Sequence, residues 1–280
     1  MNYGATNDAM KKKHFTRFCE IAYDKAGIKL HEGKQALVAA RVAKRQRSLG
    51  IQTSKDYLEY LEKDENSEEL VHFLDAISTN YTFFFREKNH FDILAEKVKE
   101  WENEGQERFR FWSAASSSGE EPYSILITLL ESFNQPEHID FRLLATDIST
   151  KILSQAIGGV YDKERVEPVS RSQRLKYFNK SKTDDDELKY SIKPDVKKYV
   201  AFKRLNLSQI PFPMSGPLDI VFCRNVMIYF DNAVRQKLIS EIERLLKPGG
   251  ILMIGHTETL TGINTKLKIV KPSVYQKLET

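Results

Sequence analysis

Apolar residues recur with helical spacing over roughly the first ninety residues of the chain. The face of the first expected helix carries four of them at positions i, i+3, i+4 and i+7, namely Phe15, Phe18, Cys19 and Ala22. A second helix is expected from about Gly33 to Ser48, with Gly50 as its C-terminal stop, and two more helical patterns follow. Because no strand pattern interrupts this block, we predict an all-α N-terminal domain over residues 1–88.

The pattern changes after an aromatic run, TNYTFFFRE, that begins at Thr79. From Arg108 onward, strand patterns (FRFWSAA, FRLLATD, LDIVFCRN and GILMIGH) alternate with helical ones. This alternation predicts an α/β fold, with a mostly parallel sheet covered by helices on both faces, over residues 89–280. One interruption is expected at about residues 184–204, where ELKYSI and KKYVAFKR indicate two strands of a small antiparallel insert around the turn at Lys193, Pro194 and Asp195.

Composition excludes several classes of protein. Hydrophobic residues make up 41% of the 280 residues and charged residues 29%, which is typical of a globular protein rather than a disordered one. Two cysteines are too few for a disulfide framework, and the six histidines form no H-E-x-x-H pair, so we expect no metal site. The apolar stretches are too short to span a membrane, and no apolar segment follows the basic N-terminus. A cytoplasmic protein is therefore expected.

Charge is distributed unevenly along the predicted helical domain. Basic residues outnumber acidic ones by eleven to three between Lys11 and Arg47, for a net charge of +8. Arg41, Lys44 and Arg45 share one side of the second predicted helix by their three-and-four spacing. This side is either a solvated helix surface or a docking surface for an acidic partner, and charge alone does not decide between them.

Candidate chemistry lies at the ends of the first two predicted strands of the sheet, where α/β proteins bind ligands. The first strand leads into small residues ending at Gly119, which either let the backbone approach a ligand or form an ordinary strand-to-helix turn, and the chain contains no G-x-G-x-x-G motif. The second strand ends at Asp147, an acid suited to accept hydrogen bonds from ribose hydroxyls or, alternatively, to cap the next helix. Together they predict an adenosine-containing cofactor without phosphates, such as S-adenosylmethionine.

Several segments resemble one family. They are TNYTFFFRE, WSAASSSGEEPYS, LLATDIS, FCRNVMIYF, LLKPGG and GHTET, in this order, and the chain is similar to the chemotaxis receptor methyltransferases (the CheR family) from about Phe15 to Leu278. The resemblance implies a helical domain, a class I methyltransferase domain with a doubly wound sheet, and a small antiparallel β-subdomain inserted in it. It also implies methyl transfer from S-adenosylmethionine to chemoreceptor glutamates, giving γ-glutamyl methyl esters and S-adenosylhomocysteine.

The resemblance assigns site residues as well. Those expected at the cofactor are Asn80, Thr82, Arg86, Glu121, Asp147, Asn206, Leu207, Cys223 and Arg224. Glu120 competes with Glu121, and Cys223 is expected to contribute its backbone rather than its thiol. Arg86 and Tyr229 are the expected catalytic residues: Arg86 binds the cofactor's carboxylate or the incoming glutamate, and Tyr229 lies beside the transferred methyl group.

The resemblance finally implies partners. The basic second helix would dock the Glu-rich helical bundle of a receptor through Arg41, Lys44 and Arg45. The insert resembles a subdomain that, in some family members, binds a peptide at the receptor's C-terminus. We expect a monomer that uses no metal, binds no nucleic acid and does not insert into the membrane. The alternatives are a methyltransferase for another protein or a nucleic acid, and a non-catalytic scaffold that binds S-adenosylmethionine.

Overall fold

The computed structural model describes residues 10–64, 68–78, 80–183 and 185–278. It divides the chain into two compact units, one ending at residue 79 and the other beginning at Asn80. The boundary between the two units thus lies at the start of the aromatic run, between residues 79 and 80, and not at residue 88. The reason is that this run packs into the second unit: the Phe84 ring contacts the rings of Tyr161 and Phe178, and the Phe85 N–H donates to Ser124 Oγ at 2.9 Å.

The first unit is all-α, as predicted. Its elements are α1 (Lys12–Ala26), the short η1 (Glu32–Lys34), α2 (Gln35–Leu49), α3 (Ser54–Glu62) and α4 (Glu68–Ile77). Gly50 ends α2 with a left-handed φ of 71°, a conformation that side chains other than glycine disfavour. The core of the unit is aromatic, because the Phe18 ring lies 5.9 Å from that of Tyr57 and 5.5 Å from that of Phe73.

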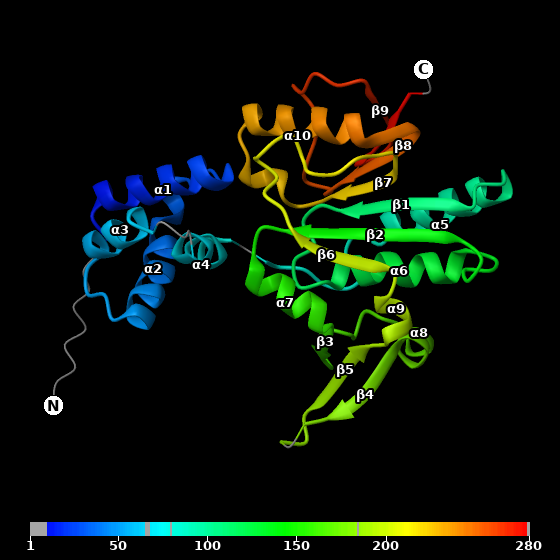
Figure 1. Cartoon of the computed structure of the whole chain (residues 1–280), viewed down its shortest axis with the longest axis horizontal. Helices are drawn as coiled ribbons and strands as arrows, with labels where there is room; N and C mark the ends of the chain where they lie inside the picture. Colours follow the sequence, from blue (N-terminus) through cyan, green and yellow to red (C-terminus); the bar gives the residue numbers. More distant parts are fainter. Residues whose placement is uncertain (1–9, 65–67, 79, 184, 279–280) are drawn as a thin grey trace. The chain divides into compact units, whose positions relative to one another are not determined.

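The second unit is built on a seven-stranded sheet of order β6-β2-β1-β7-β8-β10-β9 (Figure 1). Its strands are β1 (Arg108–Ser113), β2 (Asp140–Asp147), β6 (Val200–Arg204), β7 (Leu218–Cys223), β8 (Leu246–Ile254), β9 (Leu267–Lys271) and β10 (Val274–Lys277). The first five strands of that order are parallel, and β10 is antiparallel to both of its neighbours. The chain runs outward from β1 to β2 and β6, then crosses to β7 and β8. The switch point therefore lies between β1 and β7, where α/β sheets bind ligands.

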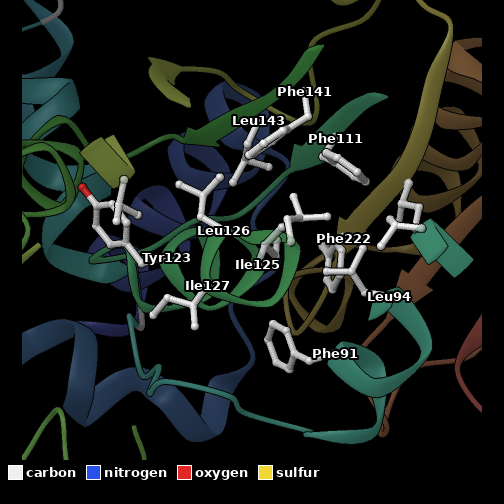
Figure 2. Close-up of a cluster of buried hydrophobic side chains, with 14 of the residues drawn as sticks. Phe91, Leu94, Phe111, Tyr123, Ile125, Leu126, Ile127, Phe141, Leu143 and Phe222 are labelled. Atoms are coloured by element: carbon white, nitrogen blue, oxygen red, sulfur yellow. The ribbon is translucent and has the colours of Figure 1, made fainter. Parts of the chain in front are cut away.

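Helices cover both faces of this sheet. Phe111 and Trp112 of β1 point to opposite faces, as successive strand residues must. On the Phe111 face lie α5 (Asn89–Asn103) and α6 (Glu120–Ser132), and Figure 2 shows Ile125 and Leu126 of α6 directed at strand side chains. On the Trp112 face, α10 (Asn232–Leu245) buries its apolar side. The predicted α/β fold, doubly wound and mostly parallel, is confirmed.

The small antiparallel sheet is present, but the predicted bounds of 184–204 were wrong. Its strands are β3 (Val160–Asp162), β4 (Phe178–Lys182) and β5 (Leu188–Ile192), and in Figure 1 they lie beside α8 (Arg171–Tyr177). The segment KKYVAFKR instead forms β6, which pairs in parallel with β2. The cause is Pro194: it begins a short helix, α9 (Pro194–Lys197), which ends the insert and directs the chain back to the main sheet.

Gly119, which caps the N-terminus of α6, gives a test of this packing. Its φ is +98°, and a Cβ atom there would lie 2.7 Å from Tyr161 Oη and 3.1 Å from the Ala156 Cα. Gly105 is a matched control, since its φ is +91° and nothing lies within 4 Å of its Cβ position. Gly105→Ala should cost about 1–2 kcal/mol for the left-handed backbone alone. Gly119→Ala should cost about 1–3 kcal/mol more through overpacking.

Chemical denaturation followed by circular dichroism measures both changes in the free energy of unfolding. Equal losses for the two variants would contradict the close packing of Gly119 against Tyr161 and α7 (Thr150–Gly158), which contains Ala156.

Candidate active site

The loop after β1 and the acid at the end of β2 are joined directly. Asp147 is buried, its Oδ2 accepts from the Ser117 N–H at 2.9 Å and its Oδ1 from the Ser149 N–H at 3.0 Å. Ser149, not Asp147, caps α7, because its side chain accepts from the Ile152 N–H. The structure therefore does not support the interpretation of Asp147 as a simple helix cap. Its carboxylate instead fixes the loop after β1 at the switch point, through the Ser117 N–H group.

The two acids at the start of α6 face different partners. Glu120 is buried, accepts from Ser118 Oγ at 2.7 Å and forms an ion pair with Arg165. Glu121 accepts from Ser113 Oγ at 2.7 Å and lies 3.2 Å from Arg224 Nη1, at the end of β7. Burial raises the pKa of Glu121, and the charge of Arg224 opposes this rise. Glu121 is thus the acid on the β1–β7 side, where a cofactor would lie.

Arg224 connects three segments of the site. Its side chain is only 1% exposed, and its Nη2 lies 3.2 Å from Glu87 Oε2 and donates to the Arg86 carbonyl oxygen. Although burial opposes the charge of Glu87, the guanidinium lowers the pKa of this carboxyl below its usual value. Two carboxylates, those of Glu87 and Glu121, each with a side chain 12% exposed, therefore share one buried cation, and the aromatic run is tied to the end of β7.

The aromatic run places the other expected residues along the same edge. The Asn80 carbonyl oxygen accepts from Ser117 Oγ at 3.3 Å, and Thr82 is half-buried. Arg86 is half-buried too; its Nη1 donates to the Tyr81 carbonyl oxygen at 3.0 Å, and its charge, like that of Arg224, opposes the rise that burial causes in the pKa of Glu121. These contacts form two groups: Asn80 and Asp147 are joined through Ser117, and Arg86 and Glu121 are joined through Arg224.

The remaining expected residues follow β6 and β7. Asn206 holds a turn, since its Oδ1 accepts from both the N–H and the hydroxyl of Ser208, and Leu207 is buried in the core on the Trp112 face. Cys223 is the last residue of β7; burial raises the pKa of its thiol well above the usual range, which makes thiolate chemistry unfavourable there. Tyr229 ends η2 (Met227–Tyr229), the turn that follows Arg224 and Asn225.

Three site residues were not singled out from the sequence. Asn225 has a φ of +56° and donates from Nδ2 to Glu87 Oε1 at 3.3 Å. Glu258 accepts from the Asn225 N–H at 2.9 Å and from the Gly255 N–H at 2.7 Å. Glu87 and Glu258 lie inside the quoted segments TNYTFFFRE and GHTET, so an acid within each segment was the available signal.

Glu87, His90 and His256 bring potential metal ligands within 4.8 Å of one another. The Glu87 carboxylate is already bound to Arg224 and Asn225, and His256 Nε2 lies 3.0 Å from Asn89 Oδ1. Burial lowers the pKa of His90 to about 3, so this imidazole is neutral at physiological pH. A cation here would compete with a guanidinium for the same carboxylate oxygen, and we place no metal at this cluster.

The predicted docking residues lie on α2, in the helical unit. Arg45 forms two hydrogen bonds to the buried Glu69, at 3.0 and 2.5 Å, and the Tyr57 hydroxyl donates to the same carboxylate. Arg41 donates to the carbonyl oxygens of Ala76 and Ser78 near the end of α4. Of the three, only Lys44 is exposed. Two of the three basic residues therefore hold α2 against its neighbours.

The strand order, the small-residue loop after β1 and the acid ending β2 are together the architecture of class I S-adenosylmethionine-dependent methyltransferases. Residues 80–276 match the family described as CheR methyltransferase, SAM binding domain, and residues 13–78 match CheR methyltransferase, all-alpha domain. The chain belongs to the CheR methyltransferase family.

Curated relatives agree with this assignment. A chemotaxis protein methyltransferase of Borreliella burgdorferi is 37% identical over 97% of this chain and 96% of its own length. One from Salmonella typhimurium is 37% identical over 95% of this chain and 91% of its own length. Among the described residues, none of the helices combines the length and apolar character that a membrane crossing requires.

The contacts of α2 lead to a prediction about stability. Arg45→Ala would leave Glu69, 4% exposed, without its cation, and breaking such a pair costs about 3–5 kcal/mol when fully buried. Because the Arg45 side chain is 22% exposed, we expect a loss of about 2–3 kcal/mol in the free energy of unfolding. Lys44→Ala, the matched control on the same helix, should change it by less than about 0.5 kcal/mol. Urea denaturation compares them, and equal effects would refute a structural role for Arg45.

Proposed function

We propose that the protein methylates specific glutamate side chains of chemotaxis receptors, forming γ-glutamyl methyl esters and releasing S-adenosylhomocysteine. The names of the curated relatives, chemotaxis protein methyltransferases, support the pathway. The observation that carries the proposal is the buried cluster of Arg224, Glu87 and Glu121 at the switch point between β1 and β7. It holds polar groups of defined charge where this fold binds its cofactor.

The residues present fit S-adenosylmethionine. Ser116 Oγ is buried in the loop after β1 and has no hydrogen-bond partner among the described residues, as expected of a group that meets a polar ligand. Asp147 supplies a carboxylate for ribose hydroxyls, and Glu121 supplies one for a cationic group. We further propose that Asn80, Thr82, Arg86 and Arg224 contact the cofactor's amino-acid end. Asn206, Leu207 and the backbone at Cys223 would complete the pocket.

The reaction requires alignment more than proton transfer. The bound cofactor supplies an electrophilic methyl group on a sulfonium. A glutamate carboxylate has a pKa of about 4.3 and is already ionised at neutral pH, so the protein need not provide a general base. Transfer of the methyl group to an oxygen of this glutamate would leave a neutral ester and a neutral thioether, so the site has to align two groups of opposite charge rather than move a proton. Tyr229 would hold the incoming carboxylate by its hydroxyl, and a site closed to water would favour the loss of charge.

Partner recognition belongs to the same proposal. Lys44, with other exposed basic residues of the helical unit, would steer the protein toward the acidic methylation region of a receptor. Arg41 and Arg45 would contribute their charge while remaining bound to α4. The protein would act in the cytoplasm as a monomer at membrane receptor arrays, and the small antiparallel sheet is the candidate site for a receptor C-terminal peptide.

Transfer of a labelled methyl group from S-adenosylmethionine to chemoreceptor membranes tests this function. Methyl esters of glutamate release methanol in alkali, so we expect label in the receptor that is recovered as volatile methanol. Dialysis against EDTA should leave the rate unchanged, because the proposed chemistry uses no metal. Alkali-stable label in nucleic acid would indicate a nucleic-acid methyltransferase, and no transfer to any substrate would indicate a scaffold; either result refutes the proposal.

Asp147→Ala tests the placement of the cofactor. A hydrogen bond to a charged group is worth about 1.5–3 kcal/mol, and about 1.4 kcal/mol corresponds to a factor of ten, so S-adenosylhomocysteine should bind at least tenfold more weakly. Ser149→Ala is the control: it removes only the α7 cap, costs about 1 kcal/mol of stability and should leave the affinity intact. Calorimetric titration measures both. A folded Asp147→Ala variant whose Kd moves less than about threefold would show that the ribose lies elsewhere.

A further inference from the structure

Glu258 lies in the turn after β8, yet its carboxylate binds backbone groups of a different loop. Its Oε2 accepts from the Gly255 N–H of its own turn and from the Asn225 N–H of the loop after β7, at 2.7 and 2.9 Å. The N–H groups of Met227 and Ile228 also favour the ionised form, against burial, which raises the pKa of Glu258. One carboxylate oxygen thus joins the two loops through a backbone N–H group of each, and on the β7 side it holds Asn225, the first residue of the segment 225–229.

The same segment is fixed from its other side by Glu87. The Glu87 Oε1 accepts from Asn225 Nδ2 at 3.3 Å, so Asn225 is held by one acid through its backbone and by another through its side chain. Asn225 also has a left-handed φ of +56°, a conformation that costs energy in residues other than glycine and persists only when surrounding contacts impose it. A Cβ atom on Gly255 would lie 2.3 Å from Asn225 Nδ2, so the two loops are in close contact.

Residues 225–229 connect Arg224 to Tyr229, two residues expected in the site. This segment begins directly after Arg224, whose guanidinium is fixed separately by Glu87 and Glu121, and it ends in η2, whose last residue is Tyr229. Arg224 can therefore keep its place without Glu258, whereas the turn that presents Tyr229 depends on the Asn225 backbone. A carboxylate suits this task because its negative charge strengthens the hydrogen bonds from the two N–H groups, while the oxygen of an amide could accept them without that charge.

We propose that Glu258 is a positioning residue for methyl transfer, which holds residues 225–229 so that Tyr229 meets the incoming carboxylate. The inference rests on the proposed function for the role of Tyr229. Glu258 acts through the backbone of this turn. Its removal should affect turnover far more than cofactor binding.

The variants Glu258→Ala and Glu258→Gln test the proposal, with Thr257→Ala, at an exposed neighbour in the same turn, as the matched control. Hydrogen exchange measured by mass spectrometry shows, without any substrate, how firmly the backbone of residues 225–229 is held. Exchange in the peptide that spans residues 224–230 should rise at least tenfold in Glu258→Ala, less in Glu258→Gln, and not in Thr257→Ala. Glu258→Gln is the variant that better preserves the shape of the turn. If exchange were unchanged in both Glu258→Gln and Glu258→Ala, the proposal would be overturned.

Kinetics then separate positioning from a general loss of stability. In Glu258→Ala, kcat should fall at least tenfold while the Kd for S-adenosylhomocysteine stays within threefold, with partial recovery in Glu258→Gln. In a Tyr229→Phe background the same substitution should slow turnover less than twofold, because both changes remove one interaction. Effects that multiply would contradict action through Tyr229. Failure of the wild-type protein to methylate receptors would refute the proposed function instead, and exchange would still decide whether Glu258 holds the turn.

Discussion

The arrangement of the candidate site depends on one buried guanidinium. Arg224 is almost completely excluded from water, and its charge is balanced by Glu87 and Glu121, each 3.2 Å away. Removing one member of such a cluster leaves uncompensated charge in a medium that solvates it poorly. The aromatic run, the start of α6 and the end of β7 are therefore linked, although they are far apart in the sequence. This linkage explains why the aromatic run belongs with the α/β unit and not with the helices before it.

Carboxylates that accept backbone N–H groups fix the loops around this cluster. Asp147 binds the loop after β1 through Ser117, and Glu258 binds the loop after β7 through Asn225. Ser117 and Asn225 both have positive φ values, 47° and 56°, so the acids stabilise backbone conformations that the residues would not adopt alone. The edge of the sheet at which the cofactor would bind is thus preorganised by acids from neighbouring loops, which leaves little rearrangement for binding itself.

Local patterns in the sequence were sufficient for the longer helices, for the parallel strands β1, β2, β7 and β8, and for the acid at the end of β2. They failed where a partner lies far away in the chain. The strand FNKSK (β4) is mostly polar and exposed, so its pairing with β5 has no apolar signature, and β6 was assigned to the wrong sheet. Arg45 has the spacing of a docking residue, and only the tertiary structure shows that its guanidinium is paired with the Glu69 carboxylate. The role of Glu258 could not be predicted from the sequence either, because its carboxylate accepts a hydrogen bond from a backbone N–H group of another loop, that of Asn225.

The free-energy coupling between Arg224 and Glu87 tests the central claim most directly, namely that the buried ion-pair cluster holds the segments of the site together. It is obtained from the unfolding free energies of the wild type, Arg224→Met, Glu87→Gln and the double variant. Residues in one buried network couple by about 0.5–3 kcal/mol, and we predict a value in the upper half of that range, with the double variant more stable than the sum of the single losses implies. Additive losses, with a coupling near zero, would contradict the account.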